Sequence, residues 1–442
     1  TSILSLLSNF KSTAIMKNLL YLLLLPSFAF SQLNFSDPES QGLSNERIEM
    51  ITELSKRYIE DKKVANITTM VNRNGKVVYY ESFGDRGFDD KENIKKDDLY
   101  RIYSMTKPIV SVAVMQLYER GEFHLNDPID KFIPELKNLK IAINEDSLVD
   151  ANNKITIKHL LTHTSGLSYG WSSHPADAFY RKADLFNSAS SDDFIDKVSS
   201  LPLRFEPGTK YYYSISTDII GILIEKISGL SLSDYLEKNI FEPLDMEDTF
   251  FEIPKDKADR FLPNHAYNRT TKKINTTDSG TLEDSKNMEG STMRNYYDVN
   301  FYSGGGGLVS TAYDYMVFAE CLRNGGEYNG ERIIGSKTLK YMTKGHLPAS
   351  IQGIGRGESP NDPSVSARTF GLGFGIINSP ESLGVIGSKG IYSWGGAAGT
   401  IFWIDPVEEI VVVSMIQLMQ SPWTLRNDLK VATYQSIVDS FE

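Results

Sequence analysis

The sequence predicts an α/β fold in which the two ends of the chain build one domain around a mainly helical insertion. Runs with strand character lie near both ends of the chain: 66–71, 76–83, 370–377, 387–395, 400–405 and 410–416. Apolar residues at helical spacing fill much of the stretch between them. We therefore expect an α/β domain from residues 32–125 and 290–442. Residues 126–289 should form a mainly helical domain that also carries active-site loops.

Local signals justify the elements in order. Residues 48–58 repeat apolar side chains at helical spacing after Ser44, a residue type that caps helix starts. The tetrapeptide 72–75, Asn-Arg-Asn-Gly, is typical of a β-hairpin turn. A helix that begins at Pro108 should end at Gly121, because glycine favours the backbone conformation that follows a helix. Later helices are expected over these segments: 155–166, 216–228, 231–241, 311–323 and 425–441.

The first residues resemble a secretory signal. Met16 and Lys17 precede a short apolar run at 19–25, and small residues follow at Ala29 and Ser31. The run is too short to span a bilayer. We expect residues 1–31 to be an over-extended start plus a signal peptide, with Met16 as the initiator. The mature protein would then be bacterial, periplasmic or secreted, and without a stable membrane anchor.

Composition excludes several other classes of function. The net charge is -11 and no basic cluster is present, which argues against nucleic-acid binding. The single cysteine, Cys321, allows no internal disulfide and no thiolate metal cluster. His159 and His163 have a spacing that could bind zinc, but no third ligand is evident, so structural roles are expected. The sequence therefore predicts neither a metal site nor an organic cofactor.

A serine and a lysine three residues apart, Ser104 and Lys107, stand where a strand-like segment gives way to the helix at 108. On a helix, such residues share one face at roughly 5–6 Å, so the amine can reach the hydroxyl. A nearby base makes serine nucleophilic, and the helix N-terminus offers N–H groups to an oxyanion. The S-x-x-K pattern is common by chance, and a serine before a helix is often only a cap.

Several stretches together resemble the serine β-lactamase and penicillin-binding-protein superfamily, in particular its class C-related members. The stretches that carry the resemblance are Ser104-Met105-Thr106-Lys107, residues 155–167, Tyr213-Ser214, residues 229–246, and Trp394-Gly395-Gly396. The resemblance covers nearly all of the expected mature chain. It implies the β-lactamase/transpeptidase-like fold, which is an antiparallel sheet flanked by helices with a mainly helical inserted lobe.

The resemblance also implies roles for individual residues. Ser104 would be the acylated nucleophile, and either Lys107 or Tyr213 would take its proton. Tyr212 is an adjacent rival for the tyrosine role. The N–H groups of Ser104 and Ala397 would form the oxyanion hole.

Two departures from the β-lactamase pattern indicate the subclass. Trp394 stands where those enzymes carry the lysine that attracts a substrate carboxylate, and Ile215 stands where they carry an amide-binding asparagine. With Gly395 and Gly396, these positions are expected to line the substrate site. The pattern is closest to the class VIII carboxylesterases, which cleave neutral short-chain esters through an acyl-enzyme. We therefore expect a serine hydrolase whose partner is a small-molecule ester. The alternatives are a β-lactamase or D-amino-acid-specific peptidase, with a β-lactam or peptide substrate, and a non-catalytic cell-wall binding or sensor module.

Overall fold

Strands from both ends of the chain form one antiparallel sheet in the computed structural model. Among the described residues, seven strands follow the order β11-β12-β13-β14-β15-β1-β2. Their bounds are β1 Asn66–Arg73, β2 Lys76–Gly84, β11 Arg368–Phe370, β12 Gly375–Ile377, β13 Tyr392–Gly395, β14 Ile401–Asp405 and β15 Ile410–Met415. The central pairing of β1 with β15 joins the two ends, with Met70 opposite Val413. This arrangement confirms the predicted fold class.

The structure describes residues 33–285, 295–348, 350–351, 354 and 366–441. The predicted signal peptide and Met16 lie outside these residues, and so does the domain boundary predicted at 289/290. Residues Leu33–Glu442 group as one unit, so the two predicted domains stay a prediction. None of the helices in the described ranges has both the length and the apolar character that a membrane crossing needs.

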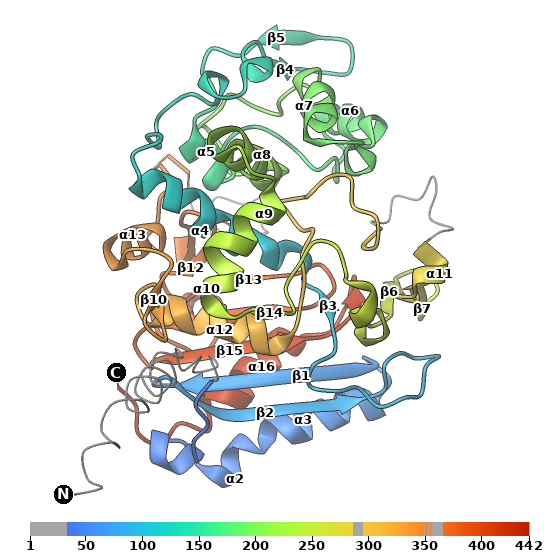
Figure 1. The fold of residues 1–442 in the computed structure, drawn as a ribbon, viewed down its shortest axis with the longest axis vertical. Helices are drawn as coiled ribbons and strands as arrows, with labels where there is room; N and C mark the ends of the chain where they lie inside the picture. Colours follow the sequence, from blue (N-terminus) through green and yellow to red (C-terminus); the bar gives the residue numbers. More distant parts are fainter. Residues whose placement is uncertain (1–32, 286–294, 349, 352–353, 355–365, 442) are drawn as a thin grey trace, which may run out of the picture. The chain divides into compact units, whose positions relative to one another are not determined.

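Helices cover both faces of the sheet (Figure 1), which explains why every residue of the central strands β1 and β15 is buried. Val411 and Val413 of β15 belong to the same core cluster as α4 (Thr106–Glu119) and α12 (Ala312–Arg323). Ile410 and Val412 belong instead to the cluster that contains α3 (Met50–Glu60) and α16 (Leu425–Tyr434). Successive side chains of a strand point to opposite faces, so one strand contributes to two cores.

The middle of the chain is mainly helical and packs onto α4. Its helices are α5 Ile157–Leu161, α6 Pro175–Ala183, α7 Ser191–Ser199, α8 Ser216–Ser228, α9 Leu232–Leu236 and α10 Glu242–Leu244. Gly221 of α8 has no side chain, and a Cβ there would lie 2.8 Å from a Leu232 methyl carbon. One difference from the expectation is the hairpin β6 (Asn264–Asn268) and β7 (Lys273–Asp278). It pairs through β6 with β16 (Leu418–Met419), so this part of the expected helical domain joins the C-terminal region.

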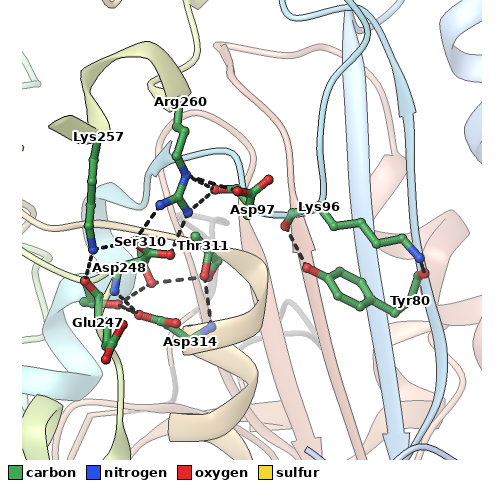
Figure 2. A network of polar contacts seen from close by, with 11 residues as sticks. Tyr80, Lys96, Asp97, Glu247, Asp248, Lys257, Arg260, Ser310, Thr311 and Asp314 are labelled. Atoms are coloured by element: carbon green, nitrogen blue, oxygen red, sulfur yellow. Dashed lines mark hydrogen bonds and ion pairs between the residues drawn. The ribbon is translucent and has the colours of Figure 1, made fainter. Parts of the chain in front are cut away.

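A polar network ties the start of α12 to the loop that follows α10 (Figure 2). The Asp314 carboxylate accepts hydrogen bonds from the Asp248 N–H at 2.8 Å and the Thr249 hydroxyl at 2.9 Å. Asp248 in turn pairs with Arg260 at 2.6 Å and Lys257 at 2.8 Å. Burial raises the pKa of Asp314 to about 7, although these donors lower it in part. The network therefore carries a carboxyl group that titrates near neutral pH.

Candidate active site

Ser104 lies in a tight turn between β3 (Tyr100–Arg101) and α4. The turn is a one-turn 3-10 helix, Tyr103–Met105, and Tyr103 has a left-handed backbone with φ of 43°. Non-glycine residues rarely adopt this conformation, and here neighbours hold it. The Tyr103 hydroxyl accepts a hydrogen bond from Asn264 at 2.9 Å, and the Tyr315 hydroxyl donates to the Met105 carbonyl at 2.9 Å. The Ser104 side chain does not cap α4, whose cap position is Met105. The simple capping explanation for this serine is therefore excluded.

Lys107 is buried to 1% exposure beside Ser104. Its Nζ donates to the Ser104 Oγ at 3.4 Å, to the Tyr169 hydroxyl at 2.9 Å and to the Gly305 carbonyl at 2.5 Å. The same Nζ lies 4.6 Å from the centre of the Tyr213 ring. A buried amine with several fixed acceptors is held in one orientation, which here points at the serine hydroxyl.

Tyr213 completes the cluster around Ser104. Its hydroxyl hydrogen-bonds with Ser104 and accepts the indole N–H of Trp394 at 3.2 Å. Burial raises the pKa of Tyr213, the bonds with Ser104 and Trp394 lower it in part, and the charge of Asp218 raises it. The net direction is upward, so the group is a neutral phenol near neutral pH.

The neighbouring Tyr212 points elsewhere. Its hydroxyl lies 3.5 Å from the Asp177 carboxylate, and the Arg204 guanidinium covers its ring at 3.6 Å. The structure thus brings Tyr213, and not the rival Tyr212, to the serine.

The two histidines of the predicted i,i+4 pair have separate partners. His163 is buried against the Tyr213 ring at 4.6 Å, and its Nδ1 accepts the Ser214 N–H at 3.3 Å. Burial, together with the charge of Lys107, holds the pKa of His163 well below its usual range, so the ring is neutral. His159 instead caps α5, because its ring accepts the Thr156 N–H at 3.2 Å.

The strand β13 and the turn that follows it form another wall of the candidate active site. Gly396 lies so close to the segment before Ser104 that a Cβ there would be 2.5 Å from the Ile102 carbonyl oxygen. Glycine is required at such an approach of two backbones. Ala397 is exposed at the tip of the turn. In the described part of the chain, neither its N–H nor that of Ser104 donates a hydrogen bond. Both predicted oxyanion donors are therefore available, and they belong to adjacent backbone segments.

The prediction that position 215 lines the substrate site needs correction. The Ile215 side chain is 0% exposed and packs in the main hydrophobic core. It stands immediately before α8, at the cap position of the helix, and its apolar side chain is turned away from solvent. A substrate cannot reach it in this structure.

Sequence reasoning missed two groups that hold Lys107. The first is Gly305, which belongs to the run of four glycines at 304–307. A Cβ at Gly305 would lie 2.3 Å from the Asp218 carboxylate and 2.8 Å from the Tyr169 hydroxyl. The Asp218 carboxylate also accepts the Gly305 N–H at 3.0 Å. The run of glycines was the available signal, because it marks backbone that neighbours approach closely.

The second missed group is an aromatic stack beside Lys107. Tyr169 stacks on Trp171 with ring centres 4.4 Å apart and planes 10° apart, and Trp171 is 70% exposed. Arg181 donates to the carbonyls on both sides of this tryptophan, those of Gly170 at 2.9 Å and Ser172 at 2.8 Å. The exposed indole is therefore presented on a fixed backbone, with its ring centre 6.2 Å from that of Tyr213.

Known proteins resemble this chain in sequence and fold. Residues 51–435 match the family described as Beta-lactamase. Esterase EstB from Burkholderia gladioli is 26% identical over 361 residues, which cover 78% of this chain and 84% of EstB. A putative D-alanyl-D-alanine carboxypeptidase from Escherichia coli K12 is 25% identical over 438 residues, which cover 92% of each chain. The solved structure of EstCE1, a hydrolase with promiscuous acyltransferase activity, matches with a TM-score of 0.73 at 20% identity. That match covers 88% of this chain and 99% of EstCE1.

These findings define a serine hydrolase with the fold of β-lactamases and penicillin-binding proteins. The chain belongs to the beta-lactamase family, whose match extends over most of its 442 residues. The family resemblance that the sequence motifs indicated is confirmed.

Proposed function

We propose that this protein is a carboxylesterase that cleaves small neutral esters through an acyl-enzyme at Ser104. The observation that carries the proposal is the contact between Trp394 and Tyr213. At the position where resembling β-lactamases carry a lysine, the indole N–H donates to the Tyr213 hydroxyl at 3.2 Å. An indole has no charge with which to pair a substrate carboxylate. The presence of Trp394 at this position therefore favours an ester without an acidic group over a β-lactam as the substrate.

In the proposed acylation, the Ser104 Oγ forms a bond to the ester carbonyl carbon and its proton leaves to the Lys107–Tyr213 pair. The alcohol then departs with a proton from the same pair, and water later attacks the acyl-enzyme and releases the acid. The N–H groups of Ser104 and Ala397 would stabilise the oxyanion, and one such donor is typically worth about 3–4 kcal/mol.

Lys107 and Tyr213 are close enough to titrate as a pair. Their separation of 4.6 Å, from Nζ to ring centre, means that the protonation state of one group affects the other. The reactive state is the one in which the pair lacks one proton. This state has either a lysine amine beside a phenol or an ammonium beside a phenolate, and the raised pKa of Tyr213 disfavours the phenolate.

Hydrolysis of a short-chain nitrophenyl ester tests the proposal. Purified Ser104→Ala protein should lose nearly all turnover of nitrophenyl butyrate. Ser111→Ala is the matched control, because Ser111 is a buried serine on α4 whose hydroxyl has no hydrogen-bond partner among the described residues. This variant should keep the activity. Undiminished turnover by Ser104→Ala would contradict the nucleophile assignment.

A second candidate function is a peptidase or β-lactamase activity. It is favoured by the relative from Escherichia coli, a putative D-alanyl-D-alanine carboxypeptidase that aligns over 92% of this chain. A chromogenic cephalosporin and a peptide ending in D-Ala-D-Ala separate the candidates. The proposed esterase should cleave both more slowly than the nitrophenyl ester, and the reverse order would overturn the subclass.

A further inference from the structure

Arg426 connects the last helix to the wall of the candidate site. It lies in the first turn of α16, and its Nη2 donates to the Gly396 carbonyl at 2.6 Å and to the Thr400 carbonyl at 3.0 Å. A Cβ at Gly395 would lie 2.9 Å from three atoms of the guanidinium. The cation therefore lies directly against the glycine backbone of β13. Nothing in the motif pattern of the sequence indicated this residue.

The bond from Arg426 to Gly396 acts on the peptide unit that contains the Ala397 N–H. In a trans peptide, the C=O and N–H groups are coplanar and point in opposite directions. A guanidinium that holds the Gly396 oxygen toward α16 therefore directs the Ala397 N–H away from α16. A cation at the carbonyl oxygen also draws electron density through the peptide, so the N–H becomes a stronger donor.

The other contacts of this turn set its position relative to Ser104. The Gly396 N–H donates to the Thr400 carbonyl at 2.9 Å, and the Thr400 hydroxyl donates to the Ile102 carbonyl at 3.4 Å. Ile102 precedes Ser104 by two residues. Arg426 binds the carbonyls at the two ends of this turn, those of Gly396 and Thr400, so it holds the loop closed around Ala397.

We infer that Arg426 is a positioning residue that orients and polarises the Gly396–Ala397 peptide as an oxyanion donor. This inference rests on the proposed function, because it concerns the oxyanion site of that reaction. Arg426 does not contact the reacting atoms. It acts through the Ala397 N–H, whose hydrogen bond strengthens as charge develops on the substrate oxygen.

The charge of Arg426 suggests a competing role, which is to bind a substrate carboxylate. The two roles predict different results. A carboxylate-binding residue changes KM, and does so only for anionic esters. A residue that positions an oxyanion donor lowers kcat for neutral esters and leaves KM almost unchanged.

Three variants of the full-length protein test the inference with nitrophenyl butyrate. Arg426→Gln and Arg426→Ala should lower kcat at least tenfold, with KM within twofold of the wild-type value. Millimolar guanidinium ion should restore part of the activity of Arg426→Ala, because the free cation fits the space left beside Gly395. Asn427→Ala, an exposed neighbour on the same turn of α16, should behave as wild type. Affinity for a short alkyl boronic acid, which forms a tetrahedral adduct with serine, should fall in parallel with kcat.

Two results would overturn the inference. One is full activity of Arg426→Gln on the neutral ester, and the other is a loss confined to esters that carry a carboxylate. If Arg426→Gln does not fold, as judged by its thermal unfolding, Arg426→Lys retains the charge with fewer donors and should show a smaller loss of kcat. A wild-type kcat in Arg426→Lys would then contradict the inference. If Ser104→Ala loses its activity while the Arg426 variants do not, this inference fails and the proposed esterase function stands.

Discussion

Replacing Tyr213 by phenylalanine removes one oxygen atom from the centre of the candidate site. That oxygen bonds with Ser104 and accepts the Trp394 indole N–H at 3.2 Å, while the ring keeps its contacts with His163 and Trp394. The change therefore removes a proton-transfer group with little effect on packing. Tyr212→Phe is the matched control, because it removes a neighbouring hydroxyl that lies near Asp177 instead.

The Tyr213→Phe variant should lose both activity and stability, by amounts of different size. A positioned acid–base group contributes typically about 10²–10⁴-fold to the rate, so kcat for nitrophenyl butyrate should fall by that factor in Tyr213→Phe. The Trp394 N–H also loses its acceptor. An unsatisfied buried donor costs about 1–3 kcal/mol, and the partial exposure of Trp394 places the loss of stability at the lower end.

The assay is steady-state hydrolysis of the ester, together with urea unfolding of each variant. Tyr212→Phe should keep kcat within about twofold of the wild-type value, because its hydroxyl makes a single long contact among the residues that the structure describes. Wild-type turnover by Tyr213→Phe would refute the role of this hydroxyl in proton transfer. An equal loss of kcat in Tyr212→Phe would refute the distinction between the two tyrosines.

Three further predictions concern other parts of the molecule. Trp171→Ala should raise KM for the nitrophenyl ester about 2- to 10-fold in steady-state kinetics, since an aromatic contact is worth about 0.5–1.5 kcal/mol. An unchanged KM would show that the exposed indole does not contact the substrate. Ile215→Ala should lower the free energy of unfolding in urea by about 2–5 kcal/mol, because it leaves a cavity in the core. A decrease in the free energy of unfolding below about 1 kcal/mol would contradict the burial of Ile215. Asp314 has a folded-state pKa of about 7, above the unfolded value of 3.8. Between these two pH values the folded protein binds more protons than the unfolded protein. The free energy of unfolding therefore falls as the pH rises through this range. The decrease in unfolding free energy from pH 5 to pH 8 should therefore be smaller in Asp314→Asn than in the wild type, and equal decreases would contradict the raised pKa.

Much of the fold was predictable because its signals are local. The β-branched composition of β15 and the turn sequence between β1 and β2 depend only on neighbours in the chain. The pairing of the first strands with the last could be inferred because a short strand cannot remain without a partner in a packed core. The hairpin of β6 and β7 was missed, since its polar sequence resembles a surface loop and its partner β16 is only two residues long.

The candidate site was predictable only where residues lie in recognisable motifs. Ser104, Lys107 and Tyr213 could be named from the sequence, and the structure brings them together. The contacts of Lys107 with Tyr169 and Gly305 could not be predicted, because 62 and 198 positions separate these residues from the lysine. The motif comparison also assigned Ile215 to the substrate site. Burial depends on the direction of the side chain at the start of α8, and the motif does not specify that direction.

Covalent labelling of the serine tests the central claim most directly. A nitrophenyl alkylphosphonate reacts with an activated serine and leaves a stable phosphonyl group, which mass spectrometry can locate. The wild-type protein should carry one such group per chain, on the peptide that contains Ser104, and Ser111→Ala should be labelled equally. Ser104→Ala should remain unlabelled. A phosphonyl group on another residue, or equal labelling of Ser104→Ala, would contradict the assignment of Ser104 as the nucleophile.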